Sequence, residues 1–368
     1  MPVQFPAPRV GRMEQDNTYR GVQVLRFVAA LMVVLSHLTV AVIDRHLSGD
    51  VPRWINGHSG VDVFFVISGF VMYLSCEALR DRKAAWRSFA LRRVARIVPL
   101  YWLATTLKLA ILLAAPAIFA TTTLKPSQVA ASYLFLPLLY PEGTIVPLLP
   151  VGWTLNFEMF FYALCAAALG LRRGLLIVVA PILAILAGIG LFVHTPEAME
   201  ATYTNPMVLE FLAGMLLAKY VRYVRRAHFA VAAGALVVGL LGDVLVNAEG
   251  SPWRVFVWGV PSALAVFGAI GIESHVREYL GRRWLLLGDA SYALYLVHTF
   301  IVPALVPLAA KSGIGAWTTI ALTTLLCVVA SVATYRYLEK PLARYLKKWI
   351  AAADASGAST AGRTAPAV

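Results

Sequence analysis

The sequence predicts an all-α protein that crosses a membrane many times. Sixty per cent of its 368 residues are hydrophobic and 14% are charged, whereas soluble domains carry about 25% charged residues. Long apolar segments recur along the chain, and about 20 such residues span a bilayer as a helix. Lys and Arg concentrate in alternate connections between these segments, as the positive-inside rule requires of a polytopic protein.

Ten apolar segments are long enough to be predicted as transmembrane helices. They cover residues 20–43, 60–76, 97–116, 154–170, 174–193, 205–221, 229–246, 254–272, 285–308 and 316–338. An eleventh segment, 127–140, is shorter and contains Pro137. We expect it to be re-entrant or interfacial, because irregular backbone is tolerated in a membrane where protein or water covers it.

The distribution of basic residues sets the predicted topology. Of the 32 Lys and Arg residues, 25 lie in every second connection and at the two chain ends, provided that 127–140 does not cross. We therefore predict ten crossings with both termini in the cytoplasm. The predicted parts are a cytoplasmic lead over 1–19, a transmembrane domain over 20–345 and a disordered cytoplasmic tail over 346–368, which is rich in Ala, Ser, Gly and Thr.

Two composition signals exclude other classes. The formal net charge of +13 follows from the basic connections that set topology, so it does not indicate a nucleic-acid partner. The three cysteines are scattered in or beside apolar segments, which argues against a disulfide framework or a metal site.

The first apolar segment carries the most informative polar pair. Arg26 and His37 are eleven residues apart, which returns them to almost the same helix face, about 16 Å apart along the axis. An ionisable side chain inside a span costs at least about 2.5 kcal/mol. The stripe is therefore predicted to face protein or water, and to line the active site of a membrane-embedded enzyme.

Further polar residues divide by predicted depth. Arg93 and Arg96 share a helix face at the cytoplasmic mouth of the third predicted span, and arginine suits phosphate because its planar fork donates two hydrogen bonds. Glu158 is predicted with His37 toward the outer side, and Tyr162 shares its face. Histidine suits proton abstraction near neutral pH. This pattern fits a phosphorylated donor entering from the cytoplasm.

Each assignment has a structural alternative. The two arginines could serve only to anchor topology, Glu158 could simply neutralise an arginine, and His37 could be a hydrogen-bonded packing residue. His298, Glu210 and Asp289 are predicted to be structural partners rather than catalytic residues.

Several motifs in order resemble one known family. They are the Arg26-x10-His37 spacing, GVDVFFVISGF at 60–70, RRVARIVPLYW at 92–102, GWTLNFEMFFY at 152–162, SYALYLVH at 291–298 and Glu339-Lys340-Pro341. Together they resemble the bacterial membrane-bound acyltransferase-3 family over residues 20 to about 345. GWTLNFEMFFY and the lack of an appended esterase-like domain are most similar to exopolysaccharide O-acetyltransferases of the succinoglycan type.

The resemblance implies a fold, substrates and roles. It implies a ten-helix bundle in the bacterial inner membrane, acetyl-CoA or another acyl-CoA as donor, and a polysaccharide or lipid-linked sugar as acceptor. Arg26, Arg93 and Arg96 would then hold the CoA phosphates, and His37 would be the general base or a transient acyl carrier. Glu158 would orient His37 or the sugar, on which Trp153 and Tyr162 could stack. Neither a permanently bound cofactor nor a metal is expected.

Two other functions stay open at this point. Buried ionisable residues also fit a proton-coupled transporter with His37 and Glu158 as its relay, although the sequence shows no inverted repeat. The chain could also be a non-catalytic subunit of a polysaccharide assembly complex.

Overall fold

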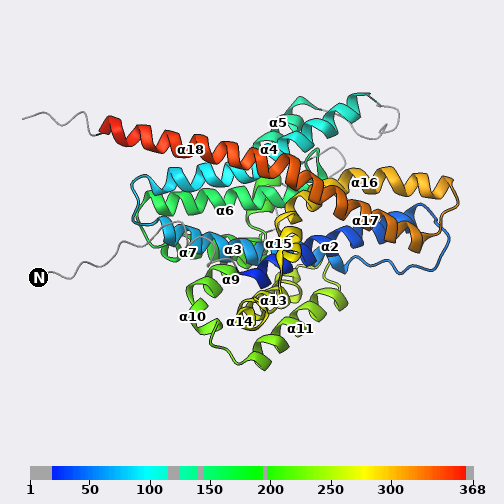
Figure 1. The fold of residues 1–368 in the computed structure, drawn as a ribbon, viewed down its shortest axis with the longest axis horizontal. Helices are drawn as coiled ribbons and strands as arrows, with labels where there is room; N and C mark the ends of the chain where they lie inside the picture. Colours follow the sequence, from blue (N-terminus) through cyan, green and yellow to red (C-terminus); the bar gives the residue numbers. More distant parts are fainter. Residues whose placement is uncertain (1–18, 115–124, 140–144, 194–196, 362–368) are drawn as a thin grey trace, which may run out of the picture.

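In the computed structural model most of the long helices run roughly along one direction, and α11 (Phe229–Leu245) and α15 (Arg282–Asp289) are inclined to them (Figure 1). The structure describes residues 19–114, 125–139, 145–193 and 197–361, and these contain no strand. Of the predicted lead, residues 1–18 lie outside the described residues, as do residues 362–368 of the predicted tail and residue 140 of the short eleventh segment.

The helices divide into longer and shorter ones. The longer ones are α2 (Arg20–Asp44), α3 (Gly60–Leu79), α4 (Ala85–Ala114), α6 (Trp153–Gly170), α7 (Leu175–Phe192), α9 (Val208–Lys219), α11 (Phe229–Leu245), α13 (Gly259–Gly271), α16 (Ser291–Lys311), α17 (Ala316–Thr334) and α18 (Lys340–Ala361). The shorter ones are η1 (Asn56–Ser59), α5 (Pro126–Leu134), η3 (Pro150–Gly152), α8 (Ala198–Tyr203), α10 (Val221–Val224), α12 (Arg254–Val257), α14 (Glu273–Val276), α15 (Arg282–Asp289) and η4 (Tyr335–Glu339).

Seven stretches of the described residues are long and apolar enough to cross a membrane. They are Arg20–Asp44, Asn56–Leu79, Ala85–Ala114, Leu175–Phe192, Arg254–Gly271, Ser291–Lys311 and Ala316–Ile350. Helices α6, α9 and α11 coincide with three further predicted spans, but α9 has 12 residues and rises about 18 Å, well short of the roughly 30 Å hydrocarbon core. The protein is therefore a multi-pass membrane protein, while ten crossings and cytoplasmic termini stay predictions.

Several predicted segments differ from the observed helices. Residues 346–361 of the tail that was predicted to be disordered belong to α18, and the span predicted over 254–272 is divided at Trp258 into α12 and α13. The span predicted over 285–308 is divided at Ala290, because α15 ends at Asp289 and α16 begins at Ser291. Gly288 of α15 packs directly on the backbone carbonyl of Gln23, so this short helix is fixed against α2 rather than continuing α16. Within the eleventh segment, α5 has nine residues and rises about 14 Å, which is too short to cross.

Helix α2 is the central element of the bundle. It packs against α3, α13, α15, α16 and α17, and in Figure 1 it lies among them (blue). Its start is fixed by the buried Glu273, whose carboxylate accepts the backbone N–H groups of Arg20 at 2.9 Å and Gly21 at 2.8 Å. These are N–H groups that a helix start leaves unpaired, and a carboxylate also complements the positive end of the helix dipole.

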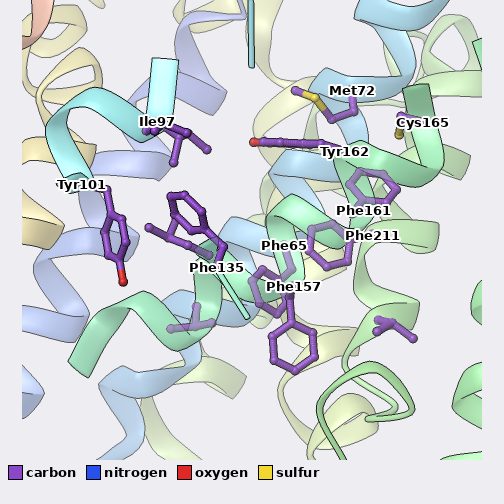
Figure 2. Packing of buried hydrophobic residues seen from close by; sticks show 14 of the residues in the cluster. Phe65, Met72, Ile97, Tyr101, Phe135, Phe157, Phe161, Tyr162, Cys165 and Phe211 are labelled. Atoms are coloured by element: carbon purple, nitrogen blue, oxygen red, sulfur yellow. The ribbon is translucent and has the colours of Figure 1, made fainter. Parts of the chain in front are cut away.

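The core beside α3 is aromatic. Phe211 of α9 stacks between Phe65 of α3 and Phe161 of α6, with ring centroids 4.5 Å apart in both pairs, and Figure 2 shows these rings together. Two glycines bring α3 and α9 into backbone contact, because a Cβ at Gly69 would overlap the Phe211 carbonyl and one at Gly214 would overlap that of Val66. Small residues at such crossings are typical of membrane helix packing.

Candidate active site

A cavity of about 540 Å³ lies between α2, α3, α4, α6 and α16. Its charged lining side chains are Arg26, Arg93, Arg96 and Glu158. Among the described residues that line it there are thus three cations and one anion. A cavity with excess positive charge and little acidic compensation favours an anionic ligand.

The three arginines come from two helices. Arg26 lies on α2, about 16 Å along the helix axis from His37. Arg93 and Arg96 lie one turn apart on α4. The guanidinium of Arg26 donates to Gln23 at 3.4 Å, and that of Arg93 to Ser75 at 3.4 Å. Arg96 is the most exposed of the three.

These arginines have hydrogen-bonding capacity to spare. In the part of the chain that the structure describes, no salt bridge within 4.0 Å joins any of the three to a carboxylate. The Nε of Arg93 is buried and has no hydrogen-bond partner. A guanidinium presents five N–H donors in a planar fork that matches phosphate. The three guanidinium groups therefore leave N–H donors available toward the cavity.

Glu158 belongs to this arginine group. Its carboxylate accepts a hydrogen bond from Tyr162, one helical turn along α6, at 3.2 Å. It lies within electrostatic range of Arg26 and Arg96. The expectation that Tyr162 and Glu158 share one face is confirmed, whereas the expectation that Glu158 lies with His37 rather than with the arginines is wrong.

His37 occupies a different position, outside this cavity. It does not line the cavity. Tyr295 does line the cavity, and its ring lies 6.0 Å from the ring of His298. The Nδ1 of His37 is 3.1 Å from the Nε2 of His298. The prediction that the Arg26 and His37 stripe faces protein or water is confirmed, because Arg26 lines the cavity and His37 contacts His298, but the two side chains do not line one cavity.

The hydrogen bonds assign the tautomers of this pair. The Nδ1 of His298 lies 3.1 Å from the Leu294 carbonyl, which accepts only, so Nδ1 of His298 carries the proton. The Nε2 of His298 is then an acceptor, and Nδ1 of His37 donates to it. A neutral His37 consequently has its lone pair on Nε2. His298, predicted as a structural partner, thus contacts His37 directly and determines which nitrogen of His37 carries the proton.

A third histidine adjoins His37. The ring of His58, in η1, lies 5.1 Å from that of His37, and its Nδ1 donates to Glu249 at 3.0 Å. This hydrogen bond lowers the pKa of Glu249, which lies in the connection between α11 and α12, below its usual value. The sequence analysis did not identify His58 or Glu249, which are 191 residues apart.

The remaining candidates have simple placements. Trp153 does not line the cavity and instead packs edge-on against Phe157, with ring centroids 5.9 Å apart. Tyr162 lies beside the arginines rather than on the histidine side. Stacking of a sugar on either ring stays a prediction.

The comparisons with known proteins decide the family. Residues 19–336 match the model of the acyltransferase domain of the acyltransferase-3 family. The chain belongs to the acyltransferase-3 family. It is therefore an acyltransferase, as the motifs at 26–37, 92–102 and 291–298 predicted.

Two known proteins are similar in sequence to this chain. The chain is 38% identical over 291 residues to the exopolysaccharide production protein ExoZ of Rhizobium meliloti (strain 1021), covering 78% of this chain and 90% of that protein. It is 24% identical over 356 residues to the peptidoglycan O-acetyltransferase OatA of Listeria monocytogenes serovar 1/2a (strain ATCC BAA-679 / EGD-e), covering 86% of this chain and 56% of that protein. No solved structure matches. The predicted likeness to exopolysaccharide proteins of this family is confirmed.

Proposed function

We propose that this acyltransferase moves an acetyl or related acyl group from acyl-CoA to a sugar hydroxyl of a cell-surface polysaccharide or its lipid-linked precursor. The observation that carries the proposal is the cavity with three arginines, at one end of α2, and the histidine pair, at the other. The names of the two relatives, one for exopolysaccharide production and one for peptidoglycan O-acetylation, support a glycan acceptor.

The donor end of the site follows from charge. CoA carries several phosphates, and the guanidinium forks of Arg93, Arg96 and Arg26 offer the bidentate donors that phosphate binds. Arg93 is half-buried beside Phe89, with its guanidinium carbon 5.6 Å from that ring, and donates to Ser75, and these contacts orient it toward the cavity. The acyl end of a CoA molecule held there would extend along α2 toward His37.

The reacting end follows from the tautomer of His37. Its Nε2 is free either to take the proton of the acceptor hydroxyl or to attack the thioester carbonyl and carry the acyl group. Tyr295 lies between the cavity and the histidines, where its hydroxyl is 3.2 Å from that of Thr154. A shift of this ring would connect the two compartments.

The cellular setting is part of the proposal. The protein would act in the bacterial inner membrane, with acyl-CoA supplied from the cytoplasm and the acceptor supplied by polysaccharide assembly machinery. Its partners would be the donor, the glycan and the lipid bilayer.

The test is the O-acetyl content of the surface polysaccharide. Polysaccharide from cells with the gene, without it, and with His37→Ala is compared by proton NMR. We expect O-acetyl signals in the first sample and their loss in the other two. A His46→Gln variant, in an exposed connection, serves as a control for histidine loss, and membrane levels of each variant are measured. Unchanged O-acetylation without the gene would contradict the proposed function.

A further inference from the structure

His58 repeats the arrangement that makes His37 reactive. Its Nδ1 proton is committed to a partner, Glu249, at 3.0 Å. Its Nε2 is buried and has no hydrogen-bond partner within the described residues. A histidine whose Nδ1 donates to a carboxylate while Nε2 stays free is the arrangement of a general base in hydrolases, where the carboxylate orients the ring and stabilises its protonated form.

This pair is held in place by one arginine. Arg254, at the start of α12, donates to both carboxylate oxygens of the fully buried Asp62 at 3.1 and 2.7 Å. The same guanidinium lies 3.5 Å from Glu249 and donates to the backbone carbonyl of His58 at 3.4 Å. Because Asp62 lies in the first turn of α3, directly after η1, these contacts of Arg254 hold His58 and Glu249 in a defined position relative to α3.

The three histidines are neighbours that differ in exposure to solvent. The side chain of His58 is 26% exposed and that of Glu249 is 41% exposed, whereas His298 is 1% exposed. His37 contacts both of the other histidines, with its ring centroid 5.1 Å from that of each.

On the basis of the proposed function, we propose that His58, oriented by Glu249, is a second catalytic residue that removes the proton of the acceptor hydroxyl, while His37 carries the acyl group. Two free Nε2 atoms on adjacent rings match a reaction in which one nitrogen must bind carbon and another must bind a proton. Because the side chain of Glu249 is 41% exposed, this pair also has a route by which the proton can pass to solvent.

The two steps balance as follows. In the first, Nε2 of His37 bonds to the thioester carbonyl carbon, the C–S bond breaks, and the CoA thiolate takes a proton from water. In the second, the acceptor O–H proton passes to Nε2 of His58, the acceptor oxygen bonds to the acyl carbon, and the bond to His37 breaks with its electron pair returning to nitrogen. The protonated His58 then releases its proton to water beside Glu249.

The experiment separates the two steps with purified full-length protein in lipid nanodiscs. The acceptors are polysaccharide from cells lacking the gene, and hydroxylamine, which attacks an acyl group without prior loss of a proton. We expect His58→Gln to lower transfer to polysaccharide at least about 100-fold, the usual contribution of a general base, while acetohydroxamate still forms. His37→Gln should lose both products. Glu249→Gln should resemble His58→Gln, and His46→Gln and Asp50→Asn should resemble the wild type.

The outcomes are distinguishable from failure of the proposed function. A wild-type protein that makes neither acetylated polysaccharide nor hydroxamate contradicts the function itself. A wild-type protein that acetylates polysaccharide, together with His58→Gln or Glu249→Gln variants that keep full transfer, overturns this inference alone. Loss of both products in a well-folded His58→Gln variant also overturns it, because a base for the acceptor is not required by hydroxylamine. Glu249→Gln supplies the decision if His58→Gln fails to accumulate.

Discussion

Arg93 gives the sharpest test of the proposed donor site, because its loss is expected to weaken ligand binding and to leave the stability of the unliganded protein nearly unchanged. Its buried Nε has no partner and no carboxylate lies within 4.0 Å of its guanidinium among the described residues. The unliganded protein therefore gains little from this charge, whereas a bound phosphate gains a charge-assisted fork.

The magnitude follows from the hydrogen bonds at stake. A hydrogen bond involving a charged group contributes about 1.5–3 kcal/mol, and about 1.4 kcal/mol corresponds to tenfold in affinity. Replacing Arg93 with Gln should thus weaken CoA binding by roughly 10- to 100-fold. The Arg93→Lys variant keeps the charge but lacks the planar fork, so its affinity for CoA should lie between that of the wild type and that of Arg93→Gln.

The assay is calorimetric binding of CoA to protein in nanodiscs, with thermal unfolding measured with and without CoA. We expect Arg93→Gln to unfold at or near the wild-type temperature without ligand and to lose most of the stabilisation that CoA provides. Arg92→Gln is the matched control, since Arg92 is the adjacent exposed residue and does not line the cavity. Wild-type affinity in Arg93→Gln, accompanied by a large fall in unfolding temperature, would show that Arg93 only anchors α4.

Three other predictions concern the histidine side. His298→Phe should lower turnover by at least about tenfold, measured as acetyl transfer, with CoA affinity unchanged, because His37 loses the acceptor that fixes its tautomer. Arg254→Gln should destabilise the protein by about 3–5 kcal/mol in detergent unfolding, because it leaves the carboxylate of Asp62 buried and uncompensated; Asp62→Asn on top of it should recover part of the loss. Because the pKa of Glu249 is lowered in the folded protein, its stabilisation is present at neutral pH and is lost as the pH falls through that lowered pKa. The difference in unfolding temperature between wild type and Glu249→Gln should therefore shrink in acid.

Local spacing predicted what lies on a single helix. Arg26 and His37 share α2, and Arg93 and Arg96 share α4, so helical geometry alone placed each pair on a common face. The inward orientation of α2 was likewise predictable from the cost of exposing ionisable groups to lipid. These relations need no knowledge of how separate helices pack.

Relations between helices were less accessible. The predicted depth put Glu158 with His37, but the packing of α6 against α3 and α4 brings Glu158 to the arginines instead. His58 and Glu249 lie in connections that periodicity does not order, and their contact spans 191 residues. The paired charges of Asp62 and Arg254, each at the edge of an apolar segment, were the signal that could have linked these two regions.

The continuity of α2 fixes the distance between the arginine end and the histidine end of the proposed site. Helix α2 contains no proline, and its one glycine is Gly21 at its start; it is enclosed by α3, α13, α15, α16 and α17. The rise of about 16 Å between Arg26 and His37 is therefore a fixed length, because a packed helix without a break cannot stretch. Within the proposed function, a donor binds productively when the distance between its phosphates and its acyl carbon matches the distance between Arg26 and His37. The acceptor meets no such constraint, since His58 and Glu249 lie in connections beyond the rod, and acceptor choice can then vary through those connections while donor choice stays with α2.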